Sequence, residues 1–497
     1  MQTEETQSSD PVDIPPVTGP YAEPWSLKKI IALAAVFGPA AIVASVSIGA
    51  GETIVVVRAG AWAEYNLLWL VLLSCVVKGI FVTYLLGRYT AVSGEYIGHR
   101  LVKLPGPRGW FLIAIVLFEM VGAPLAWVPI GKPCGALLHF LFKDALPSGV
   151  SQLVWENLIT SCFITLALLF GLRISFERLE KQQLIICAIL VVGTIIGTLM
   201  VRPDFSKALV GSLRFGYLPE FPGWAPSDAV ENPLLTMATA FGYVGGSVMG
   251  YIVYANWVGI HRWGMTSHQN IGAIRQRASN SGRIDYLPEH PEKVSQLRQI
   301  LAPLRWDIGM GAIVLFIVTG AFMISGAAVL YGTQSTFEGW SLLTDQASVW
   351  QNIHSSLVWV YYICIIVALW GTLQALPEIY ARVIQEFFQA VWPQYEWSYD
   401  TLRRWICLYI FVTTMILIWL NIPFDILTQI AGFILANFSI ALMMLAALYL
   451  NAKLPAAYRT RPFMFVGALI SAAVLIAFAG ISGWGLYAKI GKLFAGS

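Results

Sequence analysis

The sequence predicts an all-α polytopic membrane protein. Of its 497 residues, 57% are hydrophobic and only 12% are charged. Apolar runs of about 20 residues, the length with which a helix crosses hydrocarbon, recur along the whole chain. A soluble domain has about twice this share of charged residues. The net charge of +3 reports orientation rather than an acidic partner, so we expect a lipid bilayer and no nucleic acid around the protein.

The apolar runs divide into eleven expected spans. Two of them contain clusters of glycine and are expected to be broken. The six cysteines are scattered without a C-x-x-C pair, so they indicate neither a disulfide framework nor a metal site, and no cofactor is expected. The expected spans are 30–58 (broken), 66–87, 110–131, 151–171, 182–201, 234–260 (broken), 306–331, 355–378, 402–421, 425–450 and 462–484.

The distribution of cations predicts the orientation. With a cytoplasmic N-terminus, the inner segments hold 22 of the 31 Lys and Arg residues, the outer segments hold eight, and Lys78 alone lies within a span. Cytoplasmic segments of membrane proteins carry the excess of Lys and Arg. We therefore expect the C-terminus outside. We also expect the protein to lie in a plasma membrane, namely a bacterial inner membrane, and to be a monomer.

The first expected span is interrupted at mid-depth. Gly49, Ala50 and Gly51 break the apolar run, and Glu52 follows at once. Glycine costs about 1 kcal/mol in a helix interior, and an ionised carboxylate in hydrocarbon costs at least ~2.5 kcal/mol. A helix that accepts both penalties at one point is usually unwound there around a ligand. The competing interpretation is a glycine-lined helix crossing in which a buried cation neutralises Glu52.

The sixth expected span has the same character. Gly245, Gly246 and Gly250 cluster at its centre, with Met249 among them. Broken helices at corresponding places in two halves of a chain indicate the transport site of an inverted-repeat transporter. Glycines that only allow close helix packing are the alternative. We expect the two helices to be unwound near Gly49–Glu52 and Gly246–Gly250.

The stretch Gly38–Ala61, G-P-A-A-I-V-A-S-V-S-I-G-A-G-E-T-I-V-V-V-R-A-G-A, resembles the first span of the NRAMP divalent-metal transporters. The resemblance covers nearly the whole membrane domain, and it implies a leucine-transporter-like fold of two inverted five-helix repeats plus one extra helix. Four further stretches agree: Tyr65–Trp69, Leu172–Glu180, Val248–Tyr251 and Thr428–Ile430. The implied division is a flexible cytoplasmic tail (1–27), a first repeat (28–201), an extracellular connection (202–233), a second repeat (234–450) with a hinge-bearing cytoplasmic loop (261–305), and an eleventh helix with the C-terminus (451–497).

The chain departs from this family at its signature positions. The family's D-P-G-N falls on Gly49 to Glu52, so the metal-binding aspartate is lost and a carboxylate replaces the asparagine. Its M-P-H falls on Met249-Gly250-Tyr251, which retains the thioether. The family's second sixth-span histidine falls on Asn256, and its third-span acidic residues, which are part of its proton route, fall near Leu125 and Val128. Transport by this chain is therefore expected to be weakly coupled to protons or uncoupled, since a relay needs titratable groups within hydrogen-bond reach.

Two other charges are expected deep in spans, Lys78 in the second and Glu119 in the third. At that depth Lys78 must be paired or deprotonated. Either Glu52 or Glu119 could be its partner, and we favour Glu119, which leaves Glu52 free to bind a cation.

Three functions are compatible with these patterns. The first is a secondary transporter of a divalent cation (manganese, iron or magnesium) working by alternating access, with Glu52, Met249, carbonyls near Gly49 and Gly246, and Gln429 as candidate ligands. The second is a transporter of the same fold for a non-metal solute or an anion, with Lys78 at its centre. The third is a non-transporting membrane sensor. A membrane enzyme is disfavoured, because no span carries a nucleophile beside a titratable base or an H-E-x-x-H pair.

Overall fold

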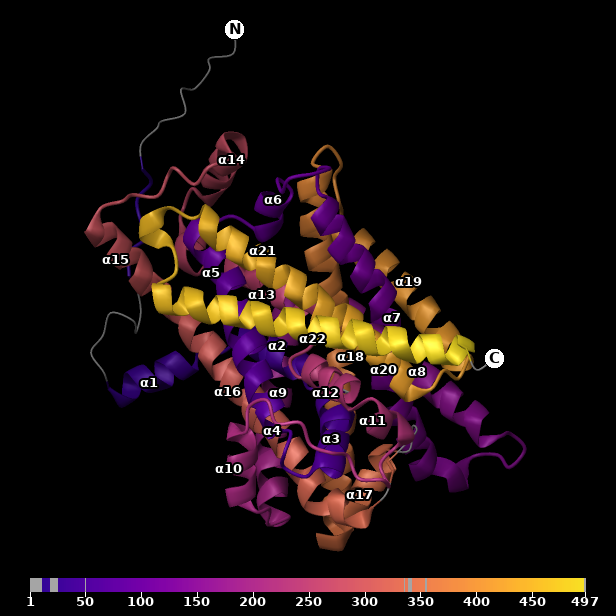
Figure 1. Cartoon of the computed structure of the whole chain (residues 1–497). Coiled ribbons are helices and arrows are strands. Elements are labelled where there is room, and N and C mark those ends of the chain that lie inside the picture. The colour runs from indigo at the N-terminus through magenta and orange to yellow at the C-terminus, as the bar shows by residue number, and fades with distance from the viewer. Residues whose placement is uncertain are drawn as a thin grey trace.

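The computed structural model describes residues 11–17, 26–49, 51–334, 336–337, 342–353 and 355–495, and throughout these ranges its regular elements are helices (Figure 1). Nine continuous helical segments of the described chain are long and apolar enough to cross a membrane, and each overlaps a different one of the eleven expected spans, although those that match the third, seventh and eighth expected spans extend well beyond the expected bounds. The two that remain are the two expected to be broken. The nine are Leu68–Ser93 (α4, η3 and α5), Trp110–Ala145 (α7 and η4), Gln152–Arg173 (α8), Phe176–Met200 (α9), Pro291–Thr333 (α15, α16, η6 and η7), Ser355–Val391 (α18), Tyr399–Trp419 (α19), Phe424–Lys453 (α20, η8 and α21) and Pro462–Lys492 (within α22).

The first expected span has an additional interruption before Pro39. A short helix, α1 (Leu27–Ala34), ends in a turn, and α2 (Pro39–Ser47) follows with a bend of 57° between the two. Proline disfavours helix at the residue before it, so Gly38 is not helical and α2 starts with proline in its first turn. The carboxylate of Asp307 in α16 (Ala302–Ser325) accepts from the backbone N–H groups of Gly38 and Ala40, each at 2.9 Å. It thereby satisfies donors that the helix itself leaves unpaired.

After α2 the first span breaks and changes helix type. Ile48 and Gly49 form a turn, Ala50 lies outside the described residues, and a π-helical turn η2 (Gly51–Val55) leads into α3 (Val56–Ala63). A Cβ on Gly51 would lie 2.8 Å from the Cβ of Tyr243, so only glycine lets the end of α12 approach this closely.

The sixth span breaks slightly earlier than expected. Helix α12 (Pro233–Tyr243) ends before Val244, and α13 begins at Val248 and runs to Ile260. Gly245 and Gly246 between them have φ of 97° and 77°, a region that L side chains rarely adopt. The expected break at Gly246–Gly250 is therefore wrong at its far end: Gly250 lies within α13, where its N–H already donates to the Ser247 carbonyl at 3.1 Å.

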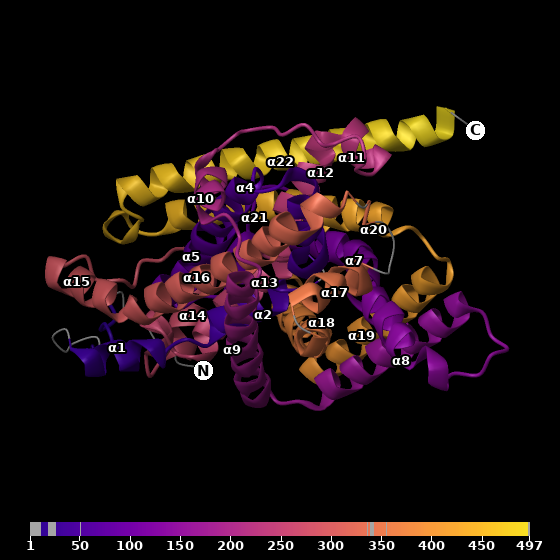
Figure 2. The ribbon, with the colours of Figure 1, turned by 90° about the horizontal axis from the view of Figure 1, so that it is seen from below.

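The broken helices lie at the centre of the molecule, surrounded by the continuous ones. Helix α2 packs against α9, α13, α16 and α18, and α12 packs against η8 (Gly432–Phe438) and α22 (Pro462–Ala495) (Figures 1 and 2). Ser45 of α2 donates to Gln183 of α9 at 2.6 Å, and the Gln183 amide donates to the Gly371 carbonyl of α18 at 3.0 Å. One polar side chain thus ties three helices together around the first break.

The connections between spans are partly helical. The expected extracellular connection contains α10 (Phe205–Leu213) and α11 (Ser227–Glu231), and α17 (Leu342–Ile353) precedes α18. The expected cytoplasmic loop contains η5 (Gly264–Ser267), α14 (Ile271–Ser281) and α15 (Pro291–Ile300). Ile14, within the expected tail, is only 4% exposed, and its carbonyl accepts from the Gln296 amide of α15 at 3.0 Å.

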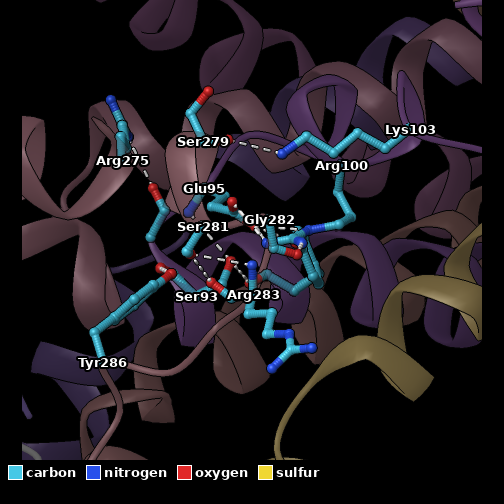
Figure 3. Close-up of polar contacts among 12 residues, drawn as sticks. Ser93, Glu95, Arg100, Lys103, Arg275, Ser279, Ser281, Gly282, Arg283 and Tyr286 are labelled. Carbon is cyan, nitrogen blue, oxygen red and sulfur yellow. Dashed lines mark hydrogen bonds and ion pairs between the residues drawn. The ribbon is translucent and has the colours of Figure 1, made fainter. Parts of the chain in front are cut away.

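The loop that carries α14 is fixed to the end of the second span (Figure 3). Arg100 of α6 (Ile97–Leu101) forms an ion pair of 2.9 Å with Glu95 and also donates to the Gly282 carbonyl. Arg275 donates to the Gly94 carbonyl at 2.8 Å, and the Tyr286 hydroxyl donates to the Ser93 carbonyl at 2.6 Å. These contacts hold the loop that carries α14 against the end of α5 (Thr83–Ser93) and against α6.

Candidate substrate site at the two helix breaks

A cavity of about 100 Å³ lies where the two broken helices meet. Its wall comes from α2 and the first break, from α12 and the second break, and from α7 (Trp110–Phe142), α18 and η8. Gly49, Gly246 and Gly250 line it, so glycines bring bare backbone to its surface. A Cβ on Gly250 would meet nothing within 4 Å, which leaves that side of α13 open to an occupant.

The polar groups of the cavity are mainly hydroxyls. Ser47, Tyr243, Thr372 and Tyr380 line it. The Tyr243 hydroxyl is buried and has no hydrogen-bond partner in the protein. A buried hydroxyl without a partner is costly, and a water or a polar ligand removes that cost. The rest of the wall is mostly apolar, so the Tyr243 hydroxyl marks the place where a water or a polar group of an occupant would be held.

Glu52 lies at the junction of the two breaks. Its carboxylate is fully buried; one oxygen accepts from the Gly49 N–H at 3.2 Å, and the other accepts from the Gly245 N–H at 3.2 Å. Both donors are backbone groups released by unwinding, so one side chain satisfies the two broken helices at once. Glu52 is not among the residues that line the cavity, and its role as a substrate ligand stays a prediction.

Lys78 is fully buried on η3 (Cys75–Val82), but it does not form the expected ion pair with Glu119. Its ammonium donates to the carbonyls of Phe241 at 2.7 Å and Gly242 at 2.8 Å. These are last-turn carbonyls of α12, where the helix dipole favours a cation. The pairing is different from the expected one because the break in the sixth span presents free carbonyls directly to Lys78.

Glu119 on α7 is also fully buried, and both of its carboxylate oxygens lack a hydrogen bond of standard geometry. The Tyr380 hydroxyl, which lines the cavity, and the Met249 N–H at the start of α13 are the polar groups facing it. Glu119 is thus a buried acid that the Tyr380 side chain separates from the cavity.

The other predicted ligands are dispersed. Met249 is fully buried and does not line the cavity. Gln429 lies in α20 (Phe424–Ala431), where it donates to Asp228 at 2.7 Å and accepts from Lys489 at 2.9 Å. This network ties α20 to α11 and α22, and it leaves no free amide for the cavity. Their roles as substrate ligands stay predictions.

The cavity hydroxyls belong to no motif that the sequence displays. A signal for Thr372 and Tyr380 is present nonetheless: with Leu376 between them they recur every four residues, the spacing of one helix face. Tyr243 is the last helical residue before a glycine pair, which places it at the break. Among the described residues, no group of three or more His, Cys, Asp or Glu side chains is placed to hold a metal.

The two discontinuous helices, which meet at a cavity inside a shell of continuous ones, define a membrane protein with the leucine-transporter-like fold. The chain belongs to the Nramp family, described as natural resistance-associated macrophage protein-like, whose sequence model matches residues 40–485. This match confirms the resemblance seen in the first span.

Individual relatives agree with this assignment. The chain is 25% identical over 308 residues to the divalent metal cation transporter MntH of Mycobacterium tuberculosis, covering 60% of this chain and 58% of that protein. It is 22% identical over 303 residues to the protein of the same name from Latilactobacillus sakei, covering 61% and 56%. The chain thus matches less than two thirds of the length of either relative.

The fold agrees with solved structures as well. Crystal structures of mutants of the Eremococcus coleocola manganese transporter superpose with a TM-score of 0.64 at 13% identity, covering 93% of this chain and 88% of that one. A structure of MhsT in complex with L-phenylalanine superposes with a TM-score of 0.50 at 13% identity, covering 90% and 98%. At these identities the comparison concerns the fold alone.

Proposed function

We propose that this protein is a secondary transporter that moves a divalent cation across a bacterial inner membrane by alternating access, without catalytic activity. The observation that carries the proposal is the Glu52 carboxylate, which joins the breaks of the first and sixth spans at the cavity. Its negative charge is placed where two helix breaks would separate or close during transport. We further propose a monomer with its N-terminus in the cytoplasm and its C-terminus outside.

The proposed occupant is a hard, partly hydrated ion held by the few polar groups of a mostly apolar cavity. Each water needs ~10–15 Å³ of such space, so a cavity of about 100 Å³ holds an ion together with several waters. Magnesium sheds water reluctantly and prefers oxygen ligands, whereas softer manganese and iron accept a thioether. The hydroxyls of Ser47, Thr372 and Tyr380 line this space, and the sulfur of Met249 does not. Magnesium is therefore the first candidate substrate, and manganese and iron follow.

The proposal keeps proton coupling weak or absent. Gly49, Leu125, Val128, Tyr251 and Asn256 occupy the positions at which the family resemblance implies metal-binding and proton-carrying side chains. Glu119 is a buried acid that faces the cavity-lining Tyr380, so any residual coupling would pass through it.

Uptake into proteoliposomes tests the function. Purified full-length protein is reconstituted with a magnesium-sensitive dye or a pH dye inside, and magnesium, manganese or iron is added outside. We expect uptake of magnesium with little acidification. Glu52→Gln should abolish uptake, whereas Glu231→Gln, a charge removal at an exposed site paired with Lys492, should not.

The same vesicles separate the competing functions. Manganese uptake without magnesium uptake would overturn the choice of ion but keep the transporter. Stoichiometric acidification would overturn weak coupling. Absence of any divalent-ion uptake, with the fold intact by circular dichroism, would reject cation transport. Transport of a non-metal solute or an anion, with Lys78 at the centre of the site, would then replace divalent-cation transport as the proposed function.

A further inference from the structure

Five arginines line one pocket at the end of the molecule where α15, α16 and the start of α22 meet. Figures 1 and 2 show where these three helices lie. The pocket has a volume of about 320 Å³ and lies apart from the cavity at the helix breaks. Its arginines come from α5, from α15, from α16 and from the connection before α22. They are Arg88, Arg298, Arg305, Arg459 and Arg461.

None of the five arginines forms an ion pair with a carboxylate of the described chain. Arg88 donates to the Tyr458 carbonyl, Arg298 to the Ala457 carbonyl at 3.2 Å, and Arg459 to the Leu454 carbonyl at 3.0 Å. Carbonyls satisfy N–H groups but neutralise no charge.

The clustering itself is unfavourable without an anion. Arg88 is only 6% exposed, and Arg298 and Arg305 lie within electrostatic range of its guanidinium. Like charges gathered around a partly buried guanidinium repel one another more strongly than they would in water. The positive-inside rule explains cations on this face of the membrane, but it does not require them to share a pocket.

A hydroxyl adds a second and independent sign of a ligand. Thr460 lines the pocket between Arg459 and Arg461, and its buried hydroxyl has no hydrogen-bond partner in the protein. Guanidinium groups form charge-assisted hydrogen bonds to phosphate oxygens, and a neighbouring hydroxyl can donate one more. The Tyr84 hydroxyl, which also lines the pocket, can supply another donor.

The other side of the pocket is apolar. Ile80, Ile308 and Met464 line it, and next to Met464 the side chain of Phe463 is 84% exposed. These residues belong to helices whose outer faces contact lipid in a membrane protein. A charged group bound by the arginines would therefore have hydrocarbon within reach of its other end.

We propose that the five-arginine pocket binds a phosphate group, and that an anionic phospholipid of the inner leaflet presents it. The shared chemistry is a phosphate oxyanion held by guanidinium groups and the Thr460 hydroxyl. A soluble phosphate compound offers the same oxyanion without the acyl chains. The apolar wall favours the lipid over the soluble source.

Native mass spectrometry of the full-length protein in neutral detergent tests the site. Palmitoyl-oleoyl phosphatidylglycerol and palmitoyl-oleoyl phosphatidylcholine are titrated separately, and inorganic phosphate and ATP form the soluble arms. The test variant is Arg298→Gln with Arg305→Gln, because both side chains are exposed and their loss should not disturb folding. The matched control is Arg173→Gln with Arg404→Gln, which removes the same charge from exposed positions that do not line the pocket.

For the wild type and the control we expect selective retention of phosphatidylglycerol over phosphatidylcholine. Losing two charge-assisted contacts should weaken that binding about tenfold or more in the test variant. Binding of phosphate or ATP with the same dependence on Arg298 and Arg305, but no lipid selectivity, would support the site and overturn the lipid as its source. Equal lipid binding by the wild type and both variants, or no binding of any probe, would overturn the site itself.

Discussion

Replacing Glu52 with Gln should loosen both helix breaks at once. The carboxylate accepts one N–H from Gly49 and one from Gly245, each at 3.2 Å. An amide keeps one acceptor oxygen and turns an NH₂ group toward the other N–H, so one charge-assisted hydrogen bond is lost. The Gly245 N–H is orphaned when it is the one that faces the NH₂ group, whereas the Gly49 N–H also donates to the Ser47 carbonyl at 2.7 Å. Together these changes cost the closed junction about 2–3 kcal/mol. That energy corresponds to an increase of about 30-fold to 150-fold in the population of the open junction.

Hydrogen–deuterium exchange of the protein in nanodiscs measures this opening, because exchange reports the free energy of local unfolding. Peptides that contain Gly49 and Gly245 should exchange faster in Glu52→Gln. The control Glu231→Gln should exchange there as the wild type does. On the proposed function, magnesium should protect both breaks in the wild type and in the control, and in Glu52→Gln it should protect neither.

Two outcomes would contradict the proposal that Glu52 couples the two breaks. If Glu52→Gln speeds exchange around Gly49 but leaves Gly245 unchanged, the carboxylate does not join the two helices. If neither break changes, the hydrogen bonds of Glu52 do not hold the junction closed, and its burial must be explained by another role.

Three further changes have separable outcomes. Gly246 has a φ of 77°, so Gly246→Ala should lower the free energy of unfolding by about 1–2 kcal/mol or more and lower the unfolding temperature. The added Cβ of Gly250→Ala projects into open space and should leave the unfolding temperature unchanged. Equal effects of the two substitutions would contradict the assigned break. Lys78→Met removes two charge-assisted hydrogen bonds from the last-turn carbonyls of α12 and should destabilise the protein by about 2–4 kcal/mol. The exposed control Lys143→Met should not. Indistinguishable thermal unfolding of the two variants would refute the role of Lys78 in capping α12. Burial lowers the pKa of His99 below its ordinary value, against the opposing effect of a neighbouring carboxylate, so its contribution to stability is complete above pH ~6.5 and is lost as the pH falls below that value. His99→Gln should therefore flatten the decline of unfolding temperature between neutral and acidic pH, and an unchanged profile would contradict this assignment.

The broken helices follow from local chemistry, and the sequence alone reveals them. A run of apolar residues long enough to cross the membrane needs no partner to be read as a span. Gly245 and Gly246 adopt positive φ, and such positions favour glycine whatever surrounds them. The interruption of the first span before Pro39 lies inside the expected range 30–58 and is not predicted. The relevant signal, proline after Gly38, was present in the sequence.

The partners of the buried charges depend on the packing of distant helices, and only the tertiary structure decides them. Glu52 and Gly245 are 193 residues apart, Lys78 and Phe241 are 163 apart, and Asp307 lies 269 residues from Gly38. Which donor faces which acceptor across such separations is set by helix rotation and register, which composition and local propensity do not encode. The sequence therefore determines that Glu52 and Lys78 must be compensated in the membrane. The packing determines that backbone groups at the break in the sixth span compensate Lys78 and, together with the Gly49 N–H, Glu52.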